Sequence, residues 1–130
     1  MYHTIIFAGN LGRDPEMRYT PEGKAVTSFS VAVSDGFGEY KKTIWIRVTT
    51  WEKTAESCNS YLKKGSSVLV EGRLMPDKET GNPRVFQRQD GSHGASYEVT
   101  ARTVRFLSTR GDAGADAGEK DMEDEENIPF

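Results

Sequence analysis

The sequence predicts an all-β fold: a small barrel of five strands with one short helix between the third and the fourth strand. Two observations predict the barrel. Short runs of apolar and β-branched residues recur along the chain, and clusters of Gly, Pro, Asp and Ser separate them. A third observation, a single segment of helical spacing after the third run, predicts the helix. At 130 residues the chain has the length of one domain with an appendage.

The first three strands are predicted from residue type and alternation. Residues 4–11 are apolar and β-branched, and Gly12 opens a turn-rich segment behind them. Residues 26–33 alternate in part and end at a Ser-Asp-Gly turn. Residues 42–51, rich in Thr, Ile, Val and Trp, form the clearest strand of the chain.

The helix and the last two strands follow in order. Over residues 52–62 apolar side chains recur at helical spacing, and two lysines and a glycine end the segment. Residues 67–74 return to strand alternation, 75–95 form a polar excursion, and 96–107 close the barrel as the fifth strand. This element order is that of the OB-fold, a partly open five-stranded Greek-key barrel.

Charge divides the chain into a mildly basic body and an acidic tail. Residues 1–111 carry a net charge of +4 and residues 112–130 a net charge of −7, which together give −3. We therefore expect a barrel domain over residues 1–110, a flexible linker over 111–120 and an acidic tip over 121–130.

The acidic tip has five acidic residues ahead of an Ile-Pro-Phe sequence. Like charges at this density repel one another and bury nothing, so we expect an extended, solvated segment. An apolar ring behind carboxylates suits a hydrophobic pocket with a basic rim on another protein, although a merely solubilising tail is the simpler alternative. The candidate protein-interaction residues are Asp124, Glu125, Glu126, Ile128, Pro129 and Phe130.

One face of the third predicted strand carries the candidate binding chemistry. Because side chains alternate across a strand, one face is aliphatic and the other carries Trp45, Arg47, Thr49 and Trp51. The two indoles stand about 20 Å apart at ~3.3 Å per residue. Such rings, with a guanidinium between them, suit stacking on unpaired bases and neutralisation of phosphate. Exposed tryptophans are also often covered by another subunit or a loop, and that alternative stays open.

Further basic and aromatic residues extend this face. Each of them alone fits an ordinary solvated side chain. Together they form a basic patch with interleaved aromatics, which can follow a phosphate backbone without reading base edges. The set comprises Phe37, Tyr40, Lys41, Lys42, Lys53, Lys63, Lys64, Lys78, Arg84, Phe86 and Arg88.

Other protein classes lack support in the sequence. His3 and His93 have no paired nucleophile or carboxylate motif, and no phosphate-binding glycine loop, HExxH or CxxC motif occurs, so we expect no enzyme, metal or cofactor. The single Cys58 excludes an internal disulfide and fits a reducing compartment. No stretch approaches the roughly 20 apolar residues of a membrane span, so we expect a soluble cytoplasmic protein with no membrane partner.

A set of short motifs, taken together, identifies a family. They are GNLGRDPE at 9–16, TIWIRV at 43–48, YLKKG at 61–65, VEGRL at 70–74 and IPF at 128–130. With these motifs the chain resembles the bacterial single-stranded DNA-binding proteins over nearly its whole length. The resemblance implies a homotetramer that binds and protects single-stranded DNA without sequence preference, located in the cytoplasm with the nucleoid. It also implies a tail that recruits replication, recombination and repair proteins.

The resemblance further implies roles for individual residues. Trp45 and Trp51 fall at stacking positions, and Phe37 falls where the family often has a tryptophan. Glu79 stands at the position of a further stacking aromatic, for which Phe86 is the candidate replacement. The basic DNA-contact positions correspond to Arg18, Arg47, Lys53, Lys64 and Lys78. An RNA-binding OB-fold protein and a protein–protein assembly module are the alternatives.

Overall fold

The computed structural model describes residues 1–107. The predicted linker and acidic tip, with the candidate residues Asp124, Glu125, Glu126, Ile128, Pro129 and Phe130, lie outside the described residues.

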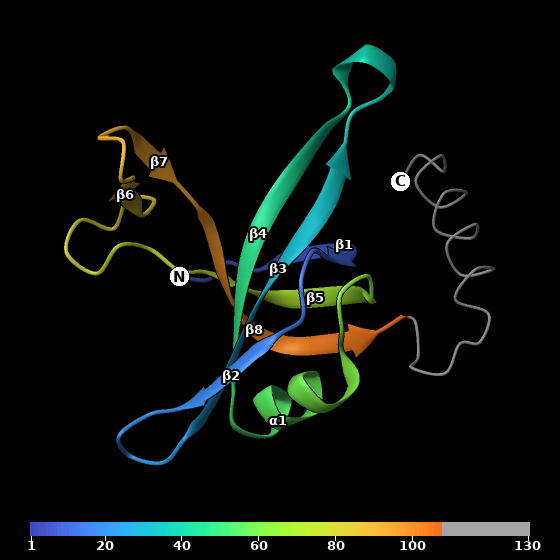
Figure 1. The fold of residues 1–130 in the computed structure, drawn as a ribbon, viewed down its shortest axis with the longest axis vertical. Coiled ribbons are helices and arrows are strands. Elements are labelled where there is room, and N and C mark those ends of the chain that lie inside the picture. The colour runs from blue at the N-terminus through green and yellow to red at the C-terminus, as the bar shows by residue number, and fades with distance from the viewer. Residues whose placement is uncertain (108–130) are drawn as a thin grey trace.

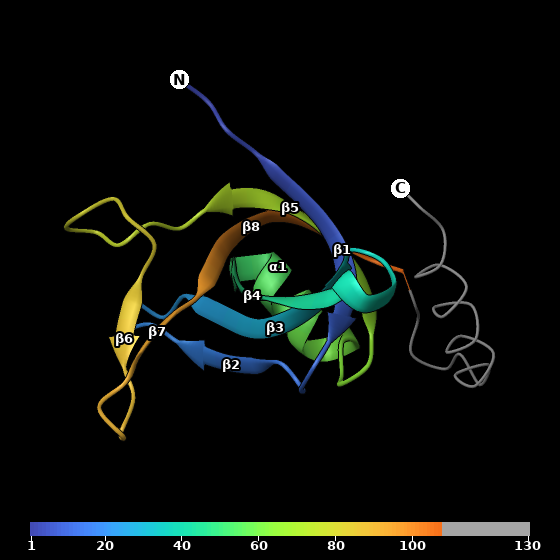
Figure 2. The ribbon, with the colours of Figure 1, turned by 90° about the horizontal axis from the view of Figure 1, so that it is seen from above.

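Six strands form one sheet that closes on itself (Figures 1 and 2). In spatial order they are β1 (Ile5–Leu11), β5 (Ser67–Leu74), β8 (Tyr97–Phe106), β4 (Lys42–Trp51), β3 (Ala25–Asp35) and β2 (Glu16–Tyr19). Because β1 pairs with both β5 and β3, the sheet becomes a barrel, and β2 extends it at the edge of β3. Neighbouring strands are antiparallel except for β4 and β8, which run parallel. The architecture is the OB-fold, as the element order predicts.

One short helix, α1 (Glu52–Tyr61), lies across one end of the barrel and is visible through the ring of strands in Figure 2. Two fully buried threonines connect it to the sheet. The Thr27 hydroxyl donates a hydrogen bond of 2.7 Å to the carbonyl oxygen of Ala55, and the Thr50 hydroxyl donates one of 2.9 Å to the carbonyl oxygen of Thr27. A buried hydroxyl needs such a partner, so these bonds fix the start of α1 relative to the end of β4, where Trp51 lies.

The core of the barrel is mostly aliphatic, and its strand residues follow the predicted alternation. It consists of Leu11, Phe29, Val31, Ile46, Val48, Cys58, Leu62, Val68, Val70 and Val99. The register between β5 and β8 shifts at Gly72, where a Cβ atom would collide with the carbonyl oxygen of Thr100. Glycine therefore lets the two strands approach closely where the sheet bends around the core.

Two features differ from the sequence-based expectation. The sequence predicts no strand at β2. Its four residues are mostly polar, and they gain strand geometry only by pairing with β3. The polar excursion 75–95 contains a hairpin of β6 (Val85–Gln87) and β7 (His93–Ala95), which pair with each other in a separate small sheet. All six of these hairpin residues are at least partly exposed, so no buried face produced a periodic signal.

Candidate nucleic-acid interface

β4 has the two faces that its alternation predicts. Ile46 and Val48 point into the core and are at most 5% exposed, whereas Trp45 and Trp51 are 53% and 43% exposed on the other face. Arg47, between them, is exposed as well. Neither indole is packed inward, so both are available to a planar partner from solvent.

The strand beside β4 leaves room around these side chains. On β3, Ala32 stands opposite Trp45 and Ser30 stands opposite Arg47 in the antiparallel register. Small side chains at these positions cannot cover the indole or the guanidinium. At these positions the outer face of the β3–β4 pair therefore has small side chains on β3 and large side chains on β4.

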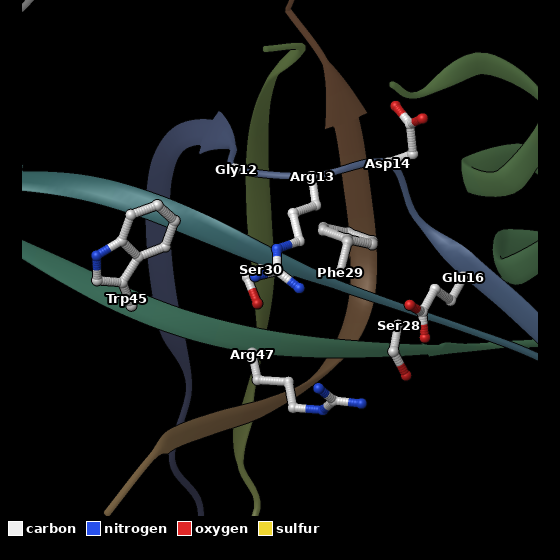
Figure 3. A pocket seen from close by; sticks show the side chains of 9 residues that line it. All are labelled: Gly12, Arg13, Asp14, Glu16, Ser28, Phe29, Ser30, Trp45 and Arg47. Atoms are coloured by element: carbon white, nitrogen blue, oxygen red, sulfur yellow. The ribbon is translucent and has the colours of Figure 1, made fainter. Parts of the chain in front are cut away.

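A first concave site, the Trp45 hollow, has a volume of about 360 Å³ and lies between β4, β3 and the connection from β1 to β2 (Figure 3). Arg13 reaches into it from the connection, and Arg47 projects into it from β4. An indole, two guanidiniums and small hydroxyl side chains together can hold a nucleobase and its phosphates. Its lining consists of Gly12, Arg13, Asp14, Glu16, Ser28, Phe29, Ser30, Trp45 and Arg47.

Gly12 determines where the indole of Trp45 lies. A Cβ atom on Gly12 would come within 2.6 Å of Cζ3 and 2.9 Å of Cη2 of the indole. The Gly12 amide donates a 3.1 Å hydrogen bond to the carbonyl oxygen of Ser30, which fixes this backbone beside β3. The absence of a side chain at Gly12 thus allows the ring to rest directly on the backbone.

Asp14 connects this hollow to the end of α1. Its Oδ1 accepts a 2.8 Å hydrogen bond from the backbone amide of Lys64. The segment that carries Lys64, one of the predicted basic positions, is therefore held beside the connection that carries Arg13 and Asp14. The structure thus brings Lys64 near the Trp45 hollow without placing it in the lining.

A second concave site, the Trp51 hollow, has a volume of about 490 Å³ and lies between the β2–β3 turn and the start of α1. It includes Lys53, one of the predicted basic residues, together with Trp51. Arg18 does not line it, but Arg18 and Trp51 are both in register with Val26 across three neighbouring strands. The lining consists of Tyr19, Gly23, Lys24, Ala25, Trp51, Glu52, Lys53, Thr54 and Glu56.

Phe37 lies apart from both hollows. It precedes the 3₁₀ turn η1 (Gly38–Tyr40) at the tip of the long β3–β4 hairpin, which rises beyond the barrel in Figure 1. Phe37 is 65% exposed. It extends the aromatic surface in the direction opposite to Trp51, since Trp51 ends β4 at α1.

The predicted residues of the long excursion also lie outside the hollows. Lys78 is exposed in a turn where Asp77 accepts backbone hydrogen bonds from Glu79 and Thr80, which lower the pKa of the Asp77 carboxyl. Phe86 has one ring face occupied, because the guanidinium of Arg88 stands 5.4 Å from its centroid. Phe86 is still 43% exposed, so part of its side chain is accessible from solvent.

The excursion is attached to the barrel by an ion pair. Arg84 Nη1 lies 3.5 Å from Oε1 of Glu98, whose side chain is only 7% exposed. Glu98 is in register with Arg47 of β4, so the pair holds the excursion beside the β4 face. Arg84 is thus engaged within the protein rather than free for a ligand.

Among the exposed basic and aromatic residues that line the two hollows, sequence reasoning missed three: Arg13, Tyr19 and Lys24. Each lies in or beside a turn, and no periodic pattern singles out such positions. Their only signal in the sequence is closeness to a turn, which does not tell which strand the turn will face.

The part of the chain that the structure describes also bears on three other kinds of site: a reactive thiol, a metal site and a membrane-spanning helix. Burial raises the pKa of the Cys58 thiol to about 11, which leaves it unreactive near neutral pH. Within residues 1–107 no group of three or more His, Cys, Asp or Glu side chains is placed to hold a metal ion. No helix in this range is long and apolar enough to span a bilayer.

A family model and several known proteins that are similar to this chain all carry the name of single-stranded DNA-binding proteins. The model of the "Single-strand binding protein family" matches residues 2–107. A "Single-stranded DNA-binding protein" of Neisseria meningitidis serogroup B is 38% identical over 111 residues, which cover 82% of this chain and 60% of the relative. The protein of the same name from Bacillus cereus is 37% identical over 121 residues, covering 91% and 67%. "Single-stranded DNA-binding protein A" of Bacillus subtilis is 36% identical over 122 residues, covering 91% and 66%. The chain thus spans about three fifths to two thirds of these relatives' lengths.

Proposed function

Because the chain belongs to the single-strand binding protein family, we propose that it binds single-stranded DNA of any sequence and protects it during replication, recombination and repair. It does so as a binding protein and not as an enzyme.

The observation that carries this proposal is the pair of exposed indoles on β4, each at a hollow that also contains cations. Trp45 shares its hollow with Arg13 and Arg47, and Trp51 shares its hollow with Lys53. Stacking on an aromatic ring contributes about 1–3 kcal/mol per base and accepts every base, because every base has a π-face. The cations neutralise phosphate and contribute no sequence readout.

The remaining predicted residues enlarge this interface. Phe37 offers a further ring at the hairpin tip, and Phe86 offers one on the excursion. Arg18 and Lys64 lie beside the two hollows and add positive charge along the path of the strand. Lys78 adds a charge on the excursion.

The proposal extends to assembly and partners. The protein acts as a homotetramer in the bacterial cytoplasm, on DNA of the nucleoid, as the family resemblance implies. Its acidic tip, with Ile128, Pro129 and Phe130 behind carboxylates, recruits replication, recombination and repair proteins. The proposal that the acidic tip recruits partner proteins is supported by the composition of residues 121–130.

Tryptophan fluorescence tests the binding proposal directly, since Trp45 and Trp51 are the only two tryptophans. We expect strong quenching on titration with poly(dT) and little quenching with duplex DNA at the same salt concentration. Equal affinity for poly(U) would favour an RNA-binding protein. No quenching by any single strand at low salt would favour an assembly module whose indoles meet protein. Light scattering with and without oligo(dT) would check the tetramer in the same samples.

A further inference from the structure

One carboxylate of the Trp45 hollow holds a segment from a distant part of the chain. Asp14 lies in the connection between β1 and β2, residues 12–15, and its Oδ1 accepts the 2.8 Å hydrogen bond from the amide of Lys64, 50 residues later. Lys64 belongs to the turn between α1 and β5, residues 63–66. A hydrogen bond to a charged acceptor is stronger than one between neutral groups, so this contact joins the two segments firmly.

The other backbone amides of this turn do not hold its first half to the barrel. Gly65 donates a 2.9 Å hydrogen bond to the carbonyl oxygen of Leu11, and Leu11 donates one of 2.9 Å to the carbonyl oxygen of Ser66. The amides of Lys63 and Ser66 are bonded within the turn itself. Among the described residues, the orientation of the amide at position 64 is therefore set by Asp14.

The local sequence suits both ends of this contact. Pro15 follows Asp14, and a residue before proline is restricted to extended backbone conformations, which limits where the carboxylate can lie. Gly65 follows Lys64 with a φ angle of +90°, and a Cβ atom there would meet nothing within 4 Å. Glycine has more backbone conformations available than any other residue, so an acceptor from outside the turn is needed to select one orientation of its neighbour.

A carboxylate at this place has a cost for the proposed function. Asp14 and Glu16 are both exposed and both line the Trp45 hollow, so each repels a phosphate that approaches the two guanidiniums of that hollow. Among residues 1–107 the carboxylate of Glu16 has no hydrogen bond or ion pair, so its effect on a polyanion is repulsion. Asp14 differs, because the group that repels phosphate also holds Lys64.

We propose that Asp14 is a positioning residue that strengthens DNA binding through Lys64. Its bond to the amide keeps the backbone of Lys64 beside the Trp45 hollow, so that the ammonium of this exposed residue meets a phosphate of the strand there. The attraction gained at Lys64 exceeds the repulsion between Asp14 and the strand. This acidic residue therefore raises the affinity for a polyanion. The inference rests on the proposed function, because the ligand is the same single strand.

The first test compares Asp14→Asn with Asp14→Ala in fluorescence titrations with oligo(dT) at low salt. Asparagine keeps the Oδ1 acceptor and loses the charge, so Asp14→Asn should bind at least as tightly as the wild type. Alanine loses both, and we expect Asp14→Ala to bind about two- to tenfold more weakly although a negative charge has been removed. Binding by Asp14→Ala that equals or exceeds that of the wild type would overturn the inference.

Glu16→Ala is the matched control for charge. It removes a carboxylate from the same hollow, but one that holds no other segment among the described residues. It should bind oligo(dT) more tightly than the wild type at low salt, and the gain should shrink as salt screens the repulsion. Changes of opposite sign in Glu16→Ala and Asp14→Ala would separate positioning from charge, whereas changes of the same sign would contradict the proposal.

Lys64→Ala tests whether Asp14 acts through this lysine. The variant keeps the backbone amide and removes the ammonium, so it should lower the slope of log K against log salt concentration by about 0.7, and Asp14→Ala should do the same. In the Lys64→Ala background no ammonium is left to misplace, so Asp14→Ala should now tighten binding as Glu16→Ala does.

Two further outcomes distinguish this inference from the proposed function. Weaker binding by the double variant than by Lys64→Ala would show that Asp14 does not act through Lys64, and would overturn the inference while the proposed function stands. Failure of the wild type to bind any single strand would instead refute the proposed function.

Discussion

The indole of Trp45 rests on the backbone of Gly12, a residue that follows β1 and lies 33 positions earlier in the chain. The contact is tight enough that any side chain at Gly12 must push the ring away. The orientation of the ring is thus set from outside β4, by the end of a strand that pairs with β3. In this arrangement the indole lines the Trp45 hollow and remains 53% exposed.

Gly12→Ala should displace this indole and weaken binding. We expect a loss of about 1 kcal/mol for oligo(dT), smaller than the ~1–3 kcal/mol loss on Trp45→Ala, because the ring is moved and not removed. Fluorescence titration of both single variants and the double variant measures the coupling. If Gly12→Ala acts through the indole, it should cost little more once Trp45 is alanine. Additive losses would mean that Gly12 acts in some other way.

Arg47→Ala should lower the salt dependence of binding. Each phosphate contact on a single strand contributes about 0.7 to the slope of log K against log salt concentration, so losing one contact should reduce the slope by about that amount. Equilibrium titrations at several salt concentrations measure it. Arg105→Ala, an exposed arginine on β8 outside both hollows, is the matched control. A slope equally reduced in both variants would show that Arg47 has no special contact.

Arg84→Ala should loosen the excursion between β5 and β8. The buried carboxylate of Glu98 would lose its partner, which we expect to lower the free energy of unfolding by about 1 kcal/mol. Urea unfolding measures the loss, and limited proteolysis should cut the excursion faster. Glu98→Gln removes the buried charge but not the side chain, so it should destabilise less. Arg88→Ala, within the hairpin, should leave the attachment to the barrel intact.

Cys58 should make stability depend on pH in the alkaline range. Burial raises the pKa of its thiol from 9.0 to about 11, so the folded state binds the proton more tightly than the unfolded state. The stabilisation is complete below pH 9 and is lost as the pH rises from 9 to 11, by up to about 3 kcal/mol. Urea unfolding of the wild type and Cys58→Ala across this range isolates the thiol. A difference between the two that stays constant with pH would contradict the prediction.

Removal of residues 112–130 should tighten DNA binding at low salt. The segment carries a charge of −7 against +4 on the preceding residues, so it competes with phosphate for the basic groups of the barrel. The gain should shrink as salt screens both interactions. Titrations of the full chain and the truncated chain at low and moderate salt measure it. Equal affinities at low salt would mean that the acidic residues do not compete for this surface.

The sequence alone determined the features that depend on local periodicity. The two faces of β4 follow from strict alternation, so Trp45, Arg47 and Trp51 could be assigned to one exposed face and Ile46 and Val48 to the core. The helix after β4 follows from a change of period, and the OB-fold follows from the order of these elements. The division into a basic body and an acidic tail is a matter of composition.

Only the tertiary structure decided how distant segments share a site. Arg13 belongs to the Trp45 hollow because β1 pairs with β3 and carries the following connection over β4. Tyr19 and Lys24 belong to the Trp51 hollow because β2 adds to the edge of β3 beside α1. Closure of the barrel brings these turns to the β4 face, and that closure depends on long-range pairing and close approaches at glycines. Periodicity describes one segment at a time, so it cannot tell which turn will lie beside which strand.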